Sequence, residues 1–302
     1  MIKLCIVSFG VDIMKNKGII MIIISAFCFA LMNVFVKLSG DIPSIEKSFF
    51  RNLVAAIIAF IMLIKSKEGF YIKKRNIPLL LGRAVCGTIG IIGNFYAVDH
   101  LLLADASIIQ KLAPFFVIIF SYFILKERVN RIQILSIVIA FIGMLFIVKP
   151  SFHNTELIPS FIALIGAMAA GMAYTLVRKL SLCGVKGPQI VFYFSLFSCV
   201  SVIPYIVIHF VPLHFNQFVY LLLAGIAAAG GQFSVTAAYS YAPAKEISVY
   251  DYSQVVFSAI FGFIFFLQIP DKYSFLGYAL IFSVALLMFV KNNQRSISDI
   301  ET

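Results

Sequence analysis

The sequence predicts an all-α membrane protein with ten transmembrane helices arranged as a 5+5 inverted repeat. Three observations predict this fold: long apolar runs, a one-sided distribution of positive charge and a weak internal repeat. The chain has 302 residues, of which 62% are hydrophobic and 12% charged, and its mean hydropathy is +1.02. Soluble domains have about 25% charged residues. The composition therefore excludes a cytosolic enzyme, a nucleic-acid-binding domain and a disordered protein.

The apolar runs set the number of spans. A bilayer core of ~30 Å needs ~20 mostly apolar residues in one helix. The linkers between the runs are short, so no second soluble domain is expected, and the apolar stretch at residues 4–9 is too short to span or to predict a signal peptide. The predicted spans are residues 18–38, 45–64, 78–98, 104–125, 132–148, 157–177, 188–210, 216–240, 247–267 and 273–290.

Lysine and arginine define the expected orientation, because cytoplasmic loops of membrane proteins are enriched in these residues. Of 24 such residues, 17 fall at one set of helix ends and three (Lys47, Lys149 and Lys272) at the opposite set. We therefore expect both termini in the cytoplasm of a multi-pass inner (plasma) membrane protein. The net charge of +11 then reflects topology, with anionic membrane lipid as a partner and no nucleic acid.

The sequence resembles itself at a shift of about 142 residues. Val36–Ser39 matches Arg178–Ser181, and Asp105–Ser107 matches Glu246–Ser248. Because five is odd, the second half must enter the membrane from the opposite side, as in many transporters. The predicted division is a cytoplasmic segment at 1–17, a first five-helix repeat at 18–148, a second at 157–290 and a cytoplasmic tail at 291–302.

Local motifs point to a family. They are Phe49–Arg51, Leu112–Pro114, Leu125–Glu127, and Gly143 followed by an apolar run and Lys149–Pro150. With these motifs the chain resembles, over roughly residues 15–290, EamA-type members of the drug/metabolite transporter superfamily. This resemblance implies ten helices in two inverted repeats. It also implies transport of metabolites such as amino acids, nucleosides, S-adenosylmethionine, riboflavin, amines or sugar conjugates.

Two charged residues deep in predicted spans are candidates for the substrate path. Lys111 lies about 9 Å below the outer surface and Asp251 about 8 Å from the inner one. In a core of ~30 Å they would be about 12 Å apart in depth. Each is expected either to contact substrate or to form a structural ion pair or hydrogen bond that holds helices together.

The other charged residues have simpler interpretations. Lys37 and Arg83 are expected to extend to the membrane surface. Arg51 is expected to pair with Glu46 or with carbonyls at a helix end, or to gate substrate. The acidic residues at positions 105 and 246 stand at helix starts, where a carboxylate suits the helix dipole.

Amides and tyrosines complete the predicted site. Asn94 and Gln232 each follow glycine and either bind substrate or bridge helices. A tyrosine at mid-depth needs a hydroxyl partner, which makes such residues cavity candidates. The proposed substrate-binding residues are Asn94, Tyr96, Gln110, Lys111, Tyr174, Gln232, Tyr250, Asp251 and Tyr252, with Arg51 and Pro114 as gating residues.

The sequence favours a secondary transporter that works by alternating access. It contains no Gly-Lys-Ser/Thr phosphate-binding motif, no HExxH and no Gly-x-Ser-x-Gly, so neither ATP-driven transport nor catalysis is expected. The five cysteines are interpreted as small apolar residues, and no cofactor or metal is expected. The preferred substrate is a small zwitterionic or cationic metabolite, such as an amino acid or amine. An anionic or nucleotide-like metabolite, or a channel or scramblase-type pore, is the alternative. Substrate identity, direction, coupling and oligomeric state stay open.

Overall fold

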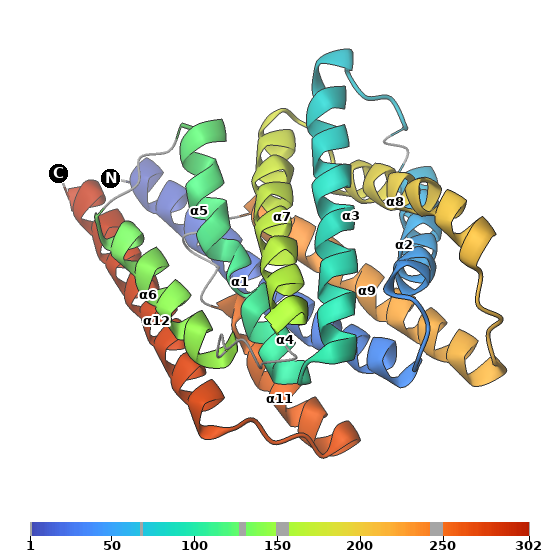
Figure 1. Cartoon of the computed structure of the whole chain (residues 1–302). Coiled ribbons are helices and arrows are strands. Elements are labelled where there is room, and N and C mark those ends of the chain that lie inside the picture. Colours follow the sequence, from blue (N-terminus) through green and yellow to red (C-terminus); the bar gives the residue numbers. More distant parts are fainter. Residues whose placement is uncertain (1, 67–68, 127–130, 149–156, 242–249, 302) are drawn as a thin grey trace.

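The computed structural model describes residues 2–66, 69–126, 131–148, 157–241 and 250–301, without the side chains of 2–15, 291–301 and a few residues between. All regular secondary structure in these ranges is helical (Figure 1). The first half contains α1 (Ile2–Leu38), α2 (Ser44–Ser66), a 3-10 turn (Lys74–Asn76), α3 (Ile77–His100), α4 (Leu103–Gln110), α5 (Ala113–Ile124) and α6 (Arg131–Val148). The second half contains α7 (Leu157–Leu182), α8 (Gly187–His209), α9 (Phe215–Tyr241), α11 (Ser253–Phe266) and α12 (Lys272–Glu301).

The helices follow the predicted spans, with differences at the chain ends. Helix α1 begins well before the predicted span, and α12 continues into the predicted tail, because neither region contains a proline or glycine pair that would end a helix. Among the described residues, seven helical stretches are long and apolar enough to cross a membrane, and Ser253–Phe266 is a shorter apolar helix. The protein is therefore a multi-pass membrane protein, while the count of ten and the orientation stay predictions.

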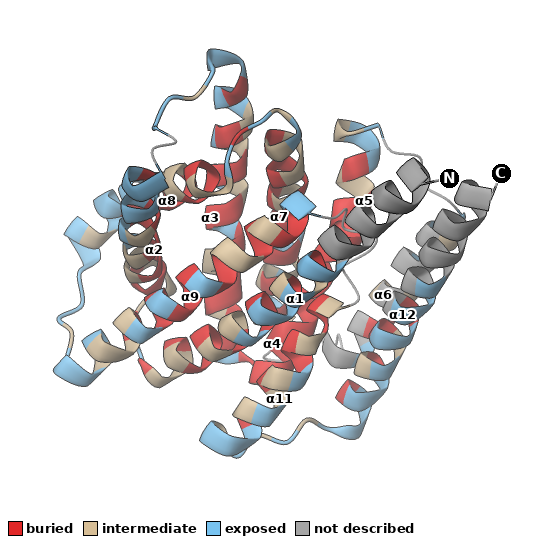
Figure 2. Cartoon of the chain, turned by 180° about the vertical axis from the view of Figure 1, so that it is seen from behind, coloured by how far each residue is buried: buried red, intermediate tan, exposed pale blue. Residues whose placement is uncertain are grey.

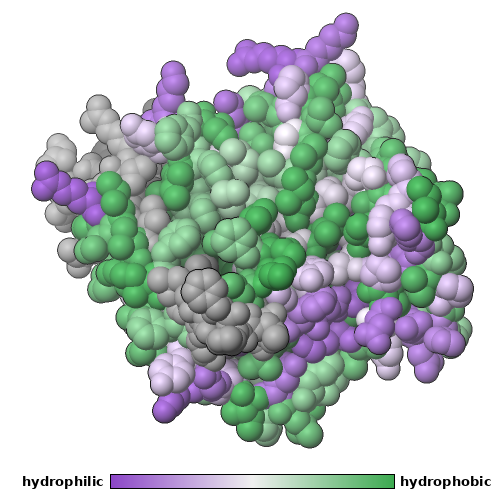
Figure 3. Space-filling view, in the orientation of Figure 1, coloured by the Kyte–Doolittle hydropathy of each residue, from purple (hydrophilic) through white to green (hydrophobic). Residues whose placement is uncertain are grey.

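The outer surface is apolar, as a lipid-facing surface must be. Large aliphatic side chains such as Ile57 and Ile64 on α2 and Val207 on α8 are exposed. Hydrophobic residues cover much of the face in Figure 3, and hydrophilic ones gather at its upper edge and in its lower right part. Buried residues instead lie along α3, α4 and α7 in the middle of the bundle (Figure 2).

The helices pair across the two halves of the chain. The most extensive contacts join α1 to α9, α3 to α7, α2 to α8 and α6 to α12. In the repeat, helices α1, α2, α3 and α6 correspond to α7, α8, α9 and α12. Exchanging corresponding helices converts the α1–α9 contact into the α3–α7 contact and leaves the α2–α8 and α6–α12 contacts unchanged. The same exchange relates the contact of α1 with α11 to that of α7 with α5. This pattern of contacts is the one expected if the two halves are related repeats.

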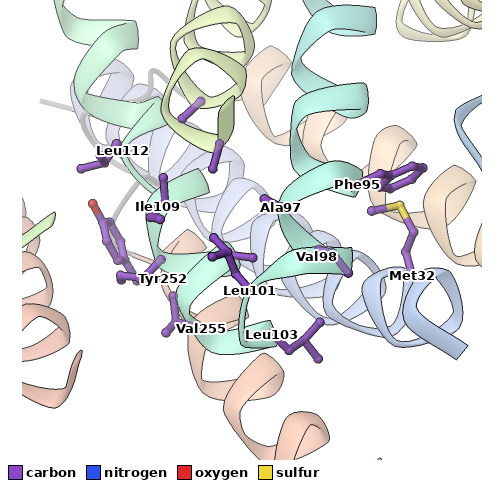
Figure 4. Packing of buried hydrophobic residues seen from close by; sticks show 14 of the residues in the cluster. Met32, Phe95, Ala97, Val98, Leu101, Leu103, Ile109, Leu112, Tyr252 and Val255 are labelled. Carbon is purple, nitrogen blue, oxygen red and sulfur yellow. The ribbon is translucent and has the colours of Figure 1, made fainter. Parts of the chain in front are cut away.

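Small residues bring α3 and α7 together. A Cβ added to Gly93 would lie 3.1 Å from the Cα of Gly166, and one added to Gly90 would lie 3.3 Å from the carbonyl oxygen of Gly166. These two glycines of α3 therefore allow close packing against α7. Beside this contact lies the largest apolar cluster, which includes Phe95 of α3, Ile109 of α4 and Val255 of α11 (Figure 4).

Both halves contain an interrupted helix at the same repeat position. The first interruption, at Lys111 and Leu112, separates α4 from α5. Pro114, at the start of α5, explains it, because proline lacks an N–H group and its ring clashes with the carbonyl four residues earlier. In the second half a turn at Tyr252 precedes α11, and the alignment of Asp251 with Gln110 also aligns Tyr252 with Lys111. The two interruptions meet in the middle of the bundle.

Candidate functional site

A polar cavity lies where the interrupted helices meet. The empty space at this site is about 710 Å³, which includes space open to solvent, and the lining residues come from both halves of the chain. The apolar part of the lining includes Phe29, Met32 and Phe194. The polar and charged lining residues are Arg51, Arg83, Asn94, Gln110, Lys111, Tyr174, Gln232, Asp251 and Gln254.

Lys111 and Asp251 form a buried ion pair across the two halves. The Nζ atom of Lys111 donates to Oδ2 of Asp251 at 2.6 Å. The predicted separation of about 12 Å in depth is therefore wrong. That prediction treated both helices as straight and ignored the reach of lysine, whereas the interruptions bring the two segments together. The expected alternative of a structural ion pair fits this geometry.

Arg83 lies in the cavity wall rather than at the membrane surface. It is only 2% exposed, and its Cζ atom lies 4.0 Å from the centre of the Phe194 ring. The prediction that Arg83 extends to lipid is therefore wrong. The reason is local: the guanidinium runs along its own helix over Gly87, where a Cβ atom would overlap Nη1 of Arg83.

Arg51 approaches the same ring from α2. Its Cζ atom lies 5.6 Å from the Phe194 ring centre, and its Nη2 donates to Oε1 of Gln232 at 3.3 Å. Its Nη1 donates to Oδ1 of Asn52 at 2.5 Å. The expected pairing with Glu46 is wrong, since Oε1 of Glu46 accepts a hydrogen bond from a backbone N–H, that of Val211, at 2.9 Å. Arg51 thus faces the cavity, consistent with the alternative of a role in the substrate path.

The two amides predicted for the site both line the cavity and also bridge helices. Nδ2 of Asn94 donates to Oδ1 of Asn33 on α1 at 3.2 Å. Gln232 accepts from Arg51 and donates to Oγ1 of Thr236 at 3.3 Å. The structure therefore confirms the helix-bridging role, and substrate binding by these amides stays a prediction.

Two more predicted residues also lie in the cavity wall. Oε1 of Gln110 is buried without a hydrogen-bond partner among the described residues. Tyr174 stacks on Tyr239, with ring centres 5.2 Å apart.

Four predicted residues lie outside the lining of this cavity. Tyr96 stacks on His100 at 4.1 Å between ring centres and lines a second, more open cavity of about 1330 Å³ beside the α1–α2 connection. Tyr250 packs partly buried against the apolar clusters. Tyr252 is 2% exposed and lies at the turn before α11. Pro114 lies in the first turn of α5, next to the other interruption.

Lys37 and Asp105 both interact near helix ends. Nζ of Lys37 donates to the carbonyl oxygens of Val98 and Leu101, at 3.1 and 2.8 Å, and so binds the end of α3; its extension to the membrane surface stays a prediction. Asp105 lies in the first turn of α4, as expected, and its Oδ1 accepts from Oη of Tyr278 at 2.7 Å. The acidic residue at position 246 lies outside the described residues.

Sequence reasoning missed Phe194 and the role of Gly87. Phe194 is one of 32 phenylalanines, and nothing in its local sequence separates it from those that face lipid. Gly87 could have been recognised only by knowing that Arg83, one turn earlier, points inward. Gln254 carried a usable signal, because it is a second polar residue within one turn of Asp251.

This arrangement defines a class of protein. A multi-pass helical chain whose two related halves meet at interrupted helices, around a buried polar cavity, has the architecture of a membrane transporter. The comparisons with known proteins agree: the chain belongs to the EamA-like transporter family, which matches residues 16–149 and 157–290. The family resemblance read from the sequence motifs is thus confirmed, and its members are transporters rather than enzymes.

Named relatives extend over most of the chain. It is 32% identical over 272 residues to the pseudopaline exporter of Pseudomonas aeruginosa, covering 89% of this chain and 94% of that protein. It is 28% identical over 267 residues to human solute carrier family 35 member G1, covering 84% of this chain and 73% of that protein. A solved crystal structure shares the fold, with a TM-score of 0.70 at 13% identity over 92% of this chain and 98% of the other.

Proposed function

We propose that this protein is a secondary transporter that moves a small organic metabolite across the plasma membrane by alternating access. The observation that carries the proposal is the Lys111–Asp251 pair, which joins the interrupted helices of the two halves inside the cavity. Interrupted helices that meet near mid-membrane are where transporters of this architecture place substrate.

Alternating access needs two closures of similar stability, one on each side of the membrane. The exchange of helix contacts between the halves supports this, because the main contacts of one half, such as that of α1 with α11, have a counterpart in the other, such as that of α7 with α5. The inverted repeats at 18–148 and 157–290, ten spans and cytoplasmic termini belong to the same proposal and rest on the sequence repeat and the charge distribution.

The charge of the cavity bears on the substrate. The sequence-based preference for a zwitterionic or cationic metabolite treated Asp251 as an available carboxylate, but Lys111 neutralises it. Three cationic side chains and one carboxylate line the cavity, a net charge of +2. A simple amine would be repelled. We therefore propose a metabolite that carries at least one anionic group, which includes zwitterions such as amino acids.

Counterflow in proteoliposomes tests the transport function. Vesicles with purified protein are loaded with an isotope-labelled bacterial metabolite extract. Mass spectrometry follows the labelled metabolites that appear in the outer solution, with and without unlabelled extract outside. A carrier releases its substrate faster when substrate is present on both sides, and release saturates. Unsaturable release that external extract does not accelerate would indicate a pore. Lys111→Gln protein, reconstituted at equal density, is the matched control.

A further inference from the structure

We infer that Arg51, Arg83 and Phe194 form an anion-binding subsite, which takes a carboxylate or phosphate group of the bound molecule. The inference rests on the proposed transport function and specifies its substrate class. The three residues come from α2, α3 and α8, so the subsite joins both halves of the chain. It is separate from the Lys111–Asp251 pair, whose charges satisfy each other.

Unsatisfied donors are the first argument. Both arginines are 2% exposed. Nε of Arg51 and both Nε and Nη1 of Arg83 have no hydrogen-bond partner among the described residues. Burying a charged donor without a partner is unfavourable, and an oxyanion relieves that cost. The planar guanidinium fork matches the spacing of carboxylate and phosphate oxygens, which makes arginine the usual residue for binding such groups.

The charge balance is the second argument. Arg51 donates to two neutral amides, Asn52 and Gln232, and neither cancels its charge. Phe194 attracts both guanidiniums through its ring face, but an aromatic ring carries no net charge. The carboxylate in the cavity lining, Asp251, is already paired with Lys111. An incoming anion would therefore compensate the two arginines.

Gly87 provides the third argument. It lines the cavity, and a Cβ there would overlap Nη1 of Arg83 and approach the Phe194 ring to 2.7 Å. Glycine at this position therefore leaves the space that the stacked guanidinium occupies. Gly82, on the same helix but outside the cavity lining, offers a matched comparison, because its added Cβ would meet a flexible leucine side chain at 3.3 Å.

Thermal unfolding in detergent, followed by helical circular dichroism, tests the subsite without any transport assay. A ligand that binds only the folded protein raises the melting temperature. Succinate and inorganic phosphate should raise it in a saturable manner. Putrescine and sodium chloride at equal ionic strength should not. Equal shifts with succinate, phosphate and putrescine would overturn the inference.

Variants locate the effect. Arg83→Gln and Arg51→Gln should each weaken succinate binding at least tenfold. Arg83→Lys should retain part of the binding, because it keeps the charge but loses the fork. Gly87→Ala should weaken binding, whereas Gly82→Ala and the exposed Arg75→Gln should bind normally. Normal succinate binding by folded Arg83→Gln and Arg51→Gln proteins would overturn the inference.

Two further arms separate the possible sources and the two proposals. In lipid-free detergent, stabilisation by succinate assigns the subsite to a soluble metabolite. Stabilisation only by phosphatidylglycerol, lost in Arg83→Gln, supports the subsite but assigns it to a lipid headgroup. Saturable counterflow of amines alone, with no anion effect, would overturn this subsite and leave the transporter intact. Anion binding without counterflow would support the subsite and overturn the proposed transport function.

Discussion

The hydroxyl of Tyr252 donates a hydrogen bond to the carbonyl oxygen of Lys111 at 2.9 Å. The two residues occupy the same position in their respective halves, and each marks the interruption of a helix. An interruption leaves carbonyl oxygens without their helical N–H partner, which is costly inside a membrane unless another group satisfies them. One half thus completes the backbone hydrogen bonding of the other, and the Lys111 side chain is held where it meets Asp251.

Tyr252→Phe should therefore destabilise the protein by about 1–3 kcal/mol, because it leaves a buried acceptor unsatisfied. Thermal or denaturant unfolding in detergent measures the loss. Tyr122→Phe, at a residue that is 52% exposed, is the control and should be neutral. A Tyr252→Phe protein as stable as the control would show that the bond does not support the interruption.

The Lys111–Asp251 pair should behave non-additively. Replacing one partner, as in Lys111→Gln or Asp251→Asn, leaves a buried charge unpaired and should cost about 3–5 kcal/mol. The double variant should be more stable than the sum of the two single losses, because no lone charge remains. A double-mutant cycle from unfolding curves measures this coupling. Strict additivity would mean that the two groups do not interact in the membrane.

Gly93→Ala should destabilise the packing of α3 against α7. The added methyl group would lie 3.1 Å from the backbone of both Gly166 and Ile162, and backbone cannot rotate away. Overpacking of this kind costs about 1–3 kcal/mol. Gly187→Ala is the control, because its nearest neighbour is a methyl group of Thr236 at 3.5 Å. Equal melting temperatures for the two variants would contradict the close approach of the helices.

Topology is open to a direct measurement. Fusing alkaline phosphatase or green fluorescent protein after residue 149 should report the outer side, and after residue 302 the cytoplasm. The 17-to-3 distribution of Lys and Arg is the reason for this expectation. Both fusions reporting the same side would rule out an odd number of spans between them and with it the 5+5 arrangement.

The sequence by itself determined the class of fold and most of the helices. Hydropathy, turn residues and loop charges are local properties, so the spans could be predicted without knowing their neighbours. A charged residue within an apolar span, such as Lys111 or Asp251, is also visible in the local sequence. It can be predicted to be functional or paired because a lone charge in a span is unfavourable. Several of the residues predicted for the site, including Gln110 and Gln232, therefore line the cavity.

Only the tertiary structure decided which of these groups meet. A long side chain such as that of Arg83 can extend along its helix in either direction, and the glycine beneath it and the aromatic ring opposite it select the inward one. Likewise, the sequence placed Lys111 and Asp251 inside spans but put them at different depths, because their contact depends on two interrupted helices that approach from different halves. Partners so far apart in the chain leave no local pattern, because packing rather than periodicity brings them together.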